Sequence, residues 1–242
     1  MFANGHGIIL MILPTICMWY GFYKALECVF KDKSAEYSNR IVTLVHACIV
    51  AYLGIGECFV DGWAFSTSND YVTNSQMTVL LLSLGYFLFD LGWCLYYKTE
   101  TNVMIAHHIY SCFAIYRTLQ KDQYGNQAAC SLGGMELTNP LLQVRWFLRT
   151  HGFQKTTVFT GVEWTFIAFF LVFRIILGTF VGYQIVSNPT HDWEYKGLAI
   201  MFYAVSWAFV FNMYNYVNKK YLRAELVAAS STLLNRNISG NS

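Results

Sequence analysis

The sequence predicts an all-α, polytopic membrane protein with seven transmembrane helices. Hydrophobic residues make up 55% of its 242 residues and charged residues only 12%, whereas soluble domains carry about 25% charged residues. The charges also cluster between long apolar stretches instead of alternating with them. Because a soluble protein of this length needs more polar surface to cover its core, we expect membrane lipids as its surroundings and partners, and no nucleic acid.

Seven stretches are long and apolar enough to cross a bilayer, which takes about 20 residues per helix. They are Gly7–Tyr23, Ile41–Val60, Met77–Tyr97, Val103–Leu119, Gln127–Leu148, Val158–Val186 and Gly197–Val217. The fifth is interrupted by the polar residues and the proline of "GGMELTNPLLQ". Membrane helices tolerate such breaks where neighbouring helices satisfy the freed backbone, so we place this stretch inside the bundle. The first stretch lacks the basic start and the small-residue cleavage site of a signal peptide, and we expect it to be retained.

The distribution of basic residues predicts the orientation. With the N-terminus outside or luminal, most of the lysines and arginines fall on the cytosolic side, as the positive-inside rule requires. The cytosolic set is Lys24, Lys31, Lys33, Arg40, Lys98, Arg145, Arg149, Lys155, Lys219, Lys220, Arg223 and Arg236. The opposite side receives Lys121 and Lys196, with Arg117 at its boundary. The C-terminus is therefore predicted to be cytosolic.

The chain divides into three predicted regions: an N-terminal helix with a cytosolic loop (1–35), one membrane domain (36–222) and a disordered cytosolic tail (223–242). Six of the seven cysteines lie within the spans and none lies in an outer loop. This distribution predicts no disulfide framework. The sequon at 237–239 falls in the cytosolic tail, so we expect it to stay unmodified.

Ionisable side chains inside membrane spans are costly and indicate functional sites. Here they are His46, Glu57, Asp90, His107, His108, Arg117, Glu136, Glu163 and Arg174. At a rise of 1.5 Å per residue, several of them reach a similar depth in the half of the bilayer nearer the cytosol. The sequence therefore predicts a polar intramembrane pocket on that side.

Helical spacing refines this pocket. Glu136, Asn139 and Gln143 follow the i, i+3, i+7 pattern and form one stripe. His107 shares a helix face with Ser111, while the adjacent His108 points about 100° away. One histidine is thus expected to face the cavity and the other a neighbouring helix.

An aspartate inside a membrane span is energetically costly unless it is paired. We therefore expect Asp90 to pair with a histidine of the fourth stretch. Either Asp90 or Glu136 is a plausible partner for Arg174.

A buried histidine can serve as a general base or as a nucleophile, and a carboxylate can orient it. His107 and His108 are therefore the catalytic candidates, and they can equally bond across helices and fix packing. The candidate cavity or lipid-binding residues are Asp90, Ser111, Glu136, Asn139 and Gln143. Arg145 and Arg149 can receive a lipid head group or the phosphates of coenzyme A, or act as interface anchors. No metal site and no other cofactor is expected, because the histidines lack a ligand spacing on one helix face.

Five blocks of the sequence resemble a known family. They are "FVDGWAF" (59–65), "LGYFLFDLGWCLYY" (84–97), "AHHIYS" (106–111), "ELTNPLLQVRWFLR" (136–149) and "MFYAVSWAFVF" (201–211). Together they resemble the TLC domain, which is shared by TRAM, the Lag-type ceramide synthases and the CLN-type proteins. The resemblance implies a six-helix barrel around a lipid-accessible cavity, preceded by one additional helix. It also implies a multi-pass location in the endoplasmic reticulum or plasma membrane, with acyl-CoA as a candidate partner; a homo-oligomer is compatible with it.

The resemblance supports three functions. The leading one is a lipid-handling protein that binds acyl lipids and contributes to membrane lipid homeostasis, with enzymatic activity left open. The first alternative is a ceramide-synthase-like, acyl-CoA-dependent acyltransferase that uses His107 and His108. Ceramide synthases continue this motif with a His-Asp pair and further aspartates, where the present sequence has "MELTNP" with Glu136 as the only acid. The second alternative is a non-enzymatic sorting or scaffold protein of the endoplasmic reticulum.

Overall fold

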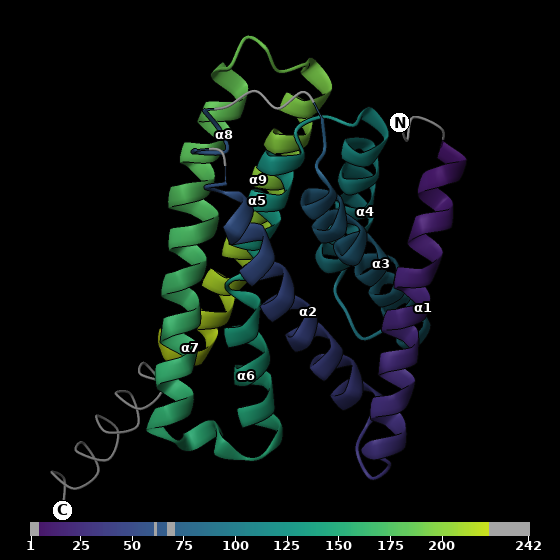
Figure 1. Ribbon diagram of the computed structural model, residues 1–242. Coiled ribbons are helices and arrows are strands. Elements are labelled where there is room, and N and C mark those ends of the chain that lie inside the picture. Colours follow the sequence, from purple (N-terminus) through teal and green to yellow (C-terminus); the bar gives the residue numbers. More distant parts are fainter. Residues whose placement is uncertain (1–4, 61, 67–70, 223–242) are drawn as a thin grey trace, which may run out of the picture.

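The computed structural model describes residues 5–60, 62–66 and 71–222, and in these ranges it is all-helical, without a β-strand (Figure 1). The α-helices are α1 (Gly5–Val29), α2 (Ala35–Glu57), α3 (Asn74–Tyr97), α4 (Asn102–Lys121), α5 (Gly125–Glu136), α6 (Asn139–Thr150), α7 (Thr157–Phe170), α8 (Leu177–Ser187) and α9 (Trp193–Val217). A 3-10 turn, η1 (Phe153–Lys155), and a π-helical turn, η2 (Leu171–Ile176), connect neighbouring helices, and a second π-helical turn, η3 (Asn218–Leu222), follows α9. The predicted tail and its sequon lie outside the described residues.

Five helical stretches are long and apolar enough to cross a membrane. They are Gly7–Val29, Ala35–Glu57, Asn74–Tyr97, Thr157–Ser187 and Trp193–Tyr221. Helix α4 and the α5–α6 segment also occupy predicted spans, but they are shorter or more polar. The count of seven transmembrane helices therefore stays a prediction, while the all-helical architecture of the described residues is confirmed.

Side-chain caps determine where many of the helices begin. In each case the residue before the first turn accepts a hydrogen bond from the backbone N–H three residues on, which satisfies a donor that the helix leaves free. These caps are Ser34, Thr73, Thr101, Thr156 and Asp192. Thr73 belongs to a full capping box, because the side chain of Gln76 accepts from the Thr73 backbone in return.

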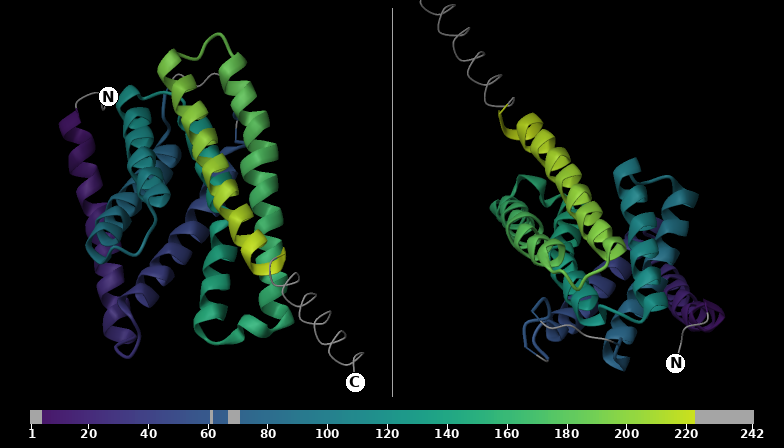
Figure 2. Two further views of the ribbon diagram at one scale, coloured as in Figure 1. Left: turned by 180° about the vertical axis from the view of Figure 1, so that it is seen from behind. Right: turned by 90° about the horizontal axis from the view of Figure 1, so that it is seen from above.

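The helices close into a ring. Helix α2 contacts α3, α3 contacts α4, and α4 contacts α9. Helix α9 contacts α8 and η2, and η2 continues from α7, which packs on α6. Helices α6 and α5 both contact α2 and complete the ring. Helix α1 stays outside this ring and packs on α3 and α2. Figures 1 and 2 show α1 along the outer edge, away from α7 and α9. The interior of the ring is where the cavities described below lie.

Two small residues bring α2 and α5 into backbone contact. A Cβ atom added to Gly133 would lie 2.6 Å from the carbonyl carbon of Gly54, so neither position has room for a larger residue. Small residues at such interfaces allow close packing between membrane helices. This contact fixes the short helix α5 against the middle of the barrel wall.

A disulfide bond between Cys58 and Cys130 lies next to that contact. The sequence analysis predicted no disulfide framework, and this prediction is wrong. Cys58 follows the last residue of α2, and Cys130 sits one turn before Gly133 on α5. The two cysteines are 72 residues apart in the chain, and the packing of α5 against α2, which includes the glycine contact, brings them together.

The predicted break in the fifth stretch is confirmed. Helix α5 ends at Glu136 and α6 begins at Asn139, with Pro140 in its first turn, where the missing N–H needs no partner. The polar run that interrupts the apolar pattern is thus the link between two half-helices.

Charged residues join the end of α4 to the start of α9. Arg117 pairs with Glu194, and the Lys121 Nζ atom lies 2.7 Å from the Asp192 carboxylate and 2.8 Å from that of Glu194. Burial alone would raise the pKa of Asp192, but the hydrogen bond from Lys121 holds that pKa below its ordinary value. These two acids therefore hold two neighbouring helices of the ring together.

Candidate functional site

Two adjoining cavities lie within the described part of the barrel. The first, here called the polar chamber, has a volume of about 1070 Å³. Its polar lining includes Asn39, Arg40, Thr43, Tyr86, Asp90, Glu100, His107, His108, Glu136, Asn139, Gln143 and Arg174. The second, the apolar chamber, has a volume of about 830 Å³ and is lined by α4, α5, η2, α8 and α9. Arg174 lines both chambers.

A buried acid–histidine pair stands in the wall of the polar chamber. The His108 Nε2 atom lies 2.7 Å from Oδ2 of Asp90, and its Nδ1 atom lies 2.8 Å from the carbonyl oxygen of Met104. Both ring nitrogens face oxygen acceptors, an arrangement that fits an imidazolium paired with a carboxylate. The expected pairing of Asp90 with a histidine of the fourth stretch is therefore present, and His108 is its partner.

His107 lies in a different environment from His108. Neither of its ring nitrogens bonds a described residue, and its Nδ1 atom is buried. The ring is instead surrounded by the edges of Phe87, Phe202 and Phe209, with centroid distances of 5.5–6.4 Å. Both histidines line the polar chamber, but only His107 has nitrogens that are free for a ligand or substrate.

Helix α2 contributes polar residues that the sequence analysis did not select. The Asn39 amide donates to Oδ1 of Asp90 at 2.8 Å, and Thr43 accepts a 3.0 Å hydrogen bond from the Tyr86 hydroxyl. His46 stacks on the ring of Tyr86 and does not line either chamber. Asn39, Thr43 and His46 follow the i, i+4, i+7 pattern, and this spacing in the sequence indicates that they share one helix face.

The predicted stripe on the fifth stretch forms a chain of hydrogen bonds across the helix break. The Asn139 amide donates to Glu136 at 3.0 Å, and the Gln143 amide donates to Oδ1 of Asn139 at 2.8 Å. All three side chains line the polar chamber. Asn139 therefore ties the end of α5 to the first turns of α6 and also borders the cavity.

Other predicted residues lie away from the chambers. Ser111 is buried, but it is absent from the lining of both cavities. The Arg145 Nε atom donates to Glu163 at 2.8 Å, and Glu163 also binds Lys220, Tyr216 and Tyr221. Arg149 is exposed in the last turn of α6. Neither arginine borders a cavity, so the structure does not bring them to the site as phosphate ligands.

Besides Arg174 and the two histidines, the described lining of the polar chamber contains one further basic residue, Arg40. It was assigned only to the cytosolic charges, yet its guanidinium binds Glu36 at 3.1 Å and Glu100 at 2.9 Å and borders the cavity. Glu100 comes from the connection between α3 and α4. Arg40 and Glu100 thus form an ion pair in the wall of the chamber.

A comparison with known protein families matches the part of the chain that forms the ring of helices. A family model of the TLC domain, named after TRAM, LAG1 and CLN8, matches residues 36–218. The chain belongs to the TLC domain family. The match begins after α1 and ends in η3, so it covers the ring of helices and every residue that lines the two large chambers. Together with the apolar helices, membership indicates an integral membrane protein with a membrane lipid-related function.

The pair in the chamber wall predicts a strong energetic coupling. The Asp90→Ala variant leaves His108 and Asn39 without their acceptor, and breaking a buried charge pair costs about 3–5 kcal/mol. The loss of unfolding free energy in the Asp90→Ala, His108→Ala double variant should be smaller than the sum of the losses in the two single variants, by roughly 0.5–3 kcal/mol. The measurement is the unfolding free energy from SDS titration of the four proteins in mixed micelles.

His151→Ala is the matched control, because His151 is exposed and bonds only the Phe147 carbonyl. Its effect should add to that of Asp90→Ala. Additive effects for the Asp90 and His108 variants as well would contradict the coupling.

Proposed function

We propose that this TLC-domain protein binds an acyl lipid inside the barrel and contributes to membrane lipid homeostasis. The observation that carries the proposal is the apolar chamber, which adjoins the polar one at Arg174. Its position beside a histidine-containing chamber suits a ligand with an apolar chain and a polar head.

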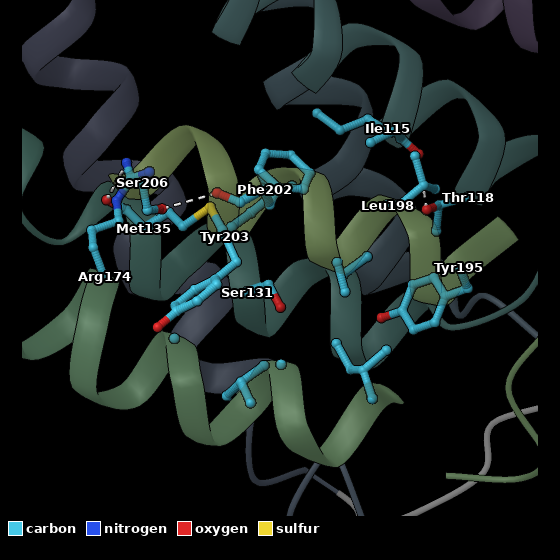
Figure 3. A pocket seen from close by; sticks show the side chains of 18 of the residues that line it. Ile115, Thr118, Ser131, Met135, Arg174, Tyr195, Leu198, Phe202, Tyr203 and Ser206 are labelled. Atoms are coloured by element: carbon cyan, nitrogen blue, oxygen red, sulfur yellow. Dashed lines mark hydrogen bonds between the residues drawn. The ribbon is translucent and has the colours of Figure 1, made fainter. Parts of the chain in front are cut away.

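The lining of the apolar chamber supports an acyl chain as its occupant. Most of the side chains are aliphatic or aromatic, and Figure 3 shows Ile115, Met135 and Phe202 among them. The hydroxyl groups of Thr118 and Ser206 are already used, since each donates to the carbonyl four residues earlier. Burial of each methylene group of a chain in such a cavity contributes about 0.8 kcal/mol.

Acyl transfer is the second candidate, and the uncommitted nitrogens of His107 favour it. In this reaction a His107 nitrogen attacks the thioester carbonyl of acyl-CoA, the C–S bond breaks and coenzyme A leaves as a thiolate. The acyl group then passes from the imidazole to an amine or hydroxyl, whose proton goes to the thiolate, and His107 returns to a neutral imidazole. The Asp90–His108 pair adjoins this position and can stabilise charge there.

We infer that the N-terminus faces the outside or the lumen and the C-terminus faces the cytosol, in the endoplasmic reticulum or plasma membrane. The basic residues support this orientation under the positive-inside rule. The Cys58–Cys130 disulfide supports it independently, because it joins the end of α2 opposite to the α1–α2 loop. Disulfides persist on the oxidising side of a membrane. We also propose, from the sequence blocks quoted above, a relationship to TLC domain-containing protein 5 within this family.

A substitution that fills the apolar chamber should displace the lipid. Gly182 lines this cavity, and a Cβ atom there would meet no atom within 4 Å. We expect Gly182→Phe to reduce co-purified acyl lipid about tenfold, which corresponds to about 1.4 kcal/mol of binding free energy. Lipid is quantified by mass spectrometry of extracts from detergent-purified protein.

Gly161→Phe is the control for this change, since Gly161 also has open space around it but lies outside the cavity lining. Equal lipid content in the two variants, or no stoichiometric lipid in the wild type, would overturn the proposed function.

The acyltransferase candidate predicts a covalent intermediate on His107. After incubation with palmitoyl-CoA, the intact mass of the wild type should increase by one palmitoyl group. His107→Ala should abolish this increase, whereas His151→Ala should retain it. An increase that survives in His107→Ala, or none in the wild type, would exclude this chemistry.

The orientation predicts which engineered sites become glycosylated. A sequon placed ahead of α1 should carry a glycan in cells, and one placed at the C-terminal end should not. The reverse pattern, read as gel shifts sensitive to endoglycosidase, would refute the assigned orientation.

A further inference from the structure

Arg174 occupies the boundary between the two chambers. It lies in the π-helical turn η2, between α7 and α8, and contributes to the lining of both cavities. Figure 3 shows its side chain extending towards Met135 and Ser206 at one end of the apolar chamber. Single π-helical turns inside α-helices are frequent at functional sites, and charged residues inside a membrane protein mark ligand or ion sites.

The guanidinium group of Arg174 is only partly satisfied. Its Nη2 atom donates to the Met135 carbonyl at 3.3 Å, and its Cζ atom lies 5.5 Å from the centroid of the Phe170 ring. The Nε and Nη1 atoms are buried without a hydrogen-bond partner. A buried donor without an acceptor costs roughly 1–3 kcal/mol, and more when the group is charged.

Among the described residues, no carboxylate lies within 4.0 Å of this guanidinium group. Glu136 follows Met135 in the chain, but its side chain accepts from Asn139 and forms no ion pair with Arg174 within 4.0 Å. The expected pairing of Arg174 with Asp90 or Glu136 is therefore not what the structure shows. Arg40, in contrast, is balanced by two glutamates. Of the two arginines in the described linings, only Arg174 has buried nitrogen donors without a hydrogen-bond partner.

We propose that Arg174 binds the carboxylate of a long-chain fatty acid whose hydrocarbon chain fills the apolar chamber. This inference rests on the proposed function and specifies the head group of the ligand. A planar guanidinium matches the geometry of a carboxylate and binds it through charge-assisted hydrogen bonds. The single cation at the boundary suits a monovalent carboxylate better than a phosphate dianion. A ligand with a neutral head group would offer the Nε and Nη1 donors no charged acceptor.

The test compares ligands that share a chain and differ in their heads. Binding of tritiated palmitate and tritiated hexadecanol to the purified full-length protein is measured by scintillation proximity, with hexadecyl phosphate as a competitor. We expect the wild type to bind palmitate at least about tenfold more tightly than hexadecanol. Arg174→Gln should remove this preference by weakening palmitate binding about tenfold while hexadecanol binding stays unchanged. Arg174→Lys, which keeps the charge, should retain part of the preference.

Each outcome has a defined meaning. Equal affinities of the wild type for palmitate and hexadecanol would overturn the carboxylate site, and this comparison needs no variant to fold. A preference that persists in Arg174→Gln would overturn the role of Arg174. Tighter binding of hexadecyl phosphate than of palmitate would replace the carboxylate by a phosphate. If neither palmitate nor hexadecanol binds, the proposed acyl-lipid function itself fails.

Discussion

The hydrogen-bonded pair of Asp90 and His108 is the interaction on which the arrangement of the polar chamber depends. An aspartate in the middle of a membrane helix is expensive unless it is paired. The pair joins α3 to α4, and the Asn39 amide adds α2 to the same carboxylate. Three helices of the ring must therefore turn their polar faces inward at one point. Because His107 lies about 100° further around α4, its ring is directed towards α9 and stays without a hydrogen bond.

The helices, the break at Pro140 and the partner of Asp90 could all be predicted from the sequence, because each follows from a large local penalty. A carboxylate inside a bilayer must find a polar partner. An apolar run of about 20 residues there must form a helix, because only a helix satisfies its backbone hydrogen bonds. Asn39 and Thr43 gave no such signal, since neutral polar residues are much less costly to bury and often bond within their own helix. Their role becomes visible only when α2 is placed against α3.

The errors concern contacts between residues that are distant in the chain. Cys58 and Cys130 pair where Gly54 and Gly133 let α2 and α5 approach closely. The spacing of the cysteines in the sequence does not reveal which of them come together in the fold. For Arg145 the sequence left two roles open, a phosphate ligand or an interface anchor, and it gave no sign of an ion pair. Its true partner, Glu163, belongs to a different helix, and their ion pair keeps the arginine outside the cavities.

The boundary between the chambers lies where two irregular points of the barrel meet. Helix α5 ends at Glu136, so its last carbonyl groups need partners from outside the helix. The Met135 carbonyl accepts from the Thr138 hydroxyl and from Arg174, which lies in the π-helical turn of the facing segment. The partial negative charge at a helix C-terminus favours a cation there, and this explains one nitrogen of Arg174. It does not satisfy the other two nitrogens, which lie where a polar head would meet an apolar chain. A barrel built only for packing would not need an arginine at this position.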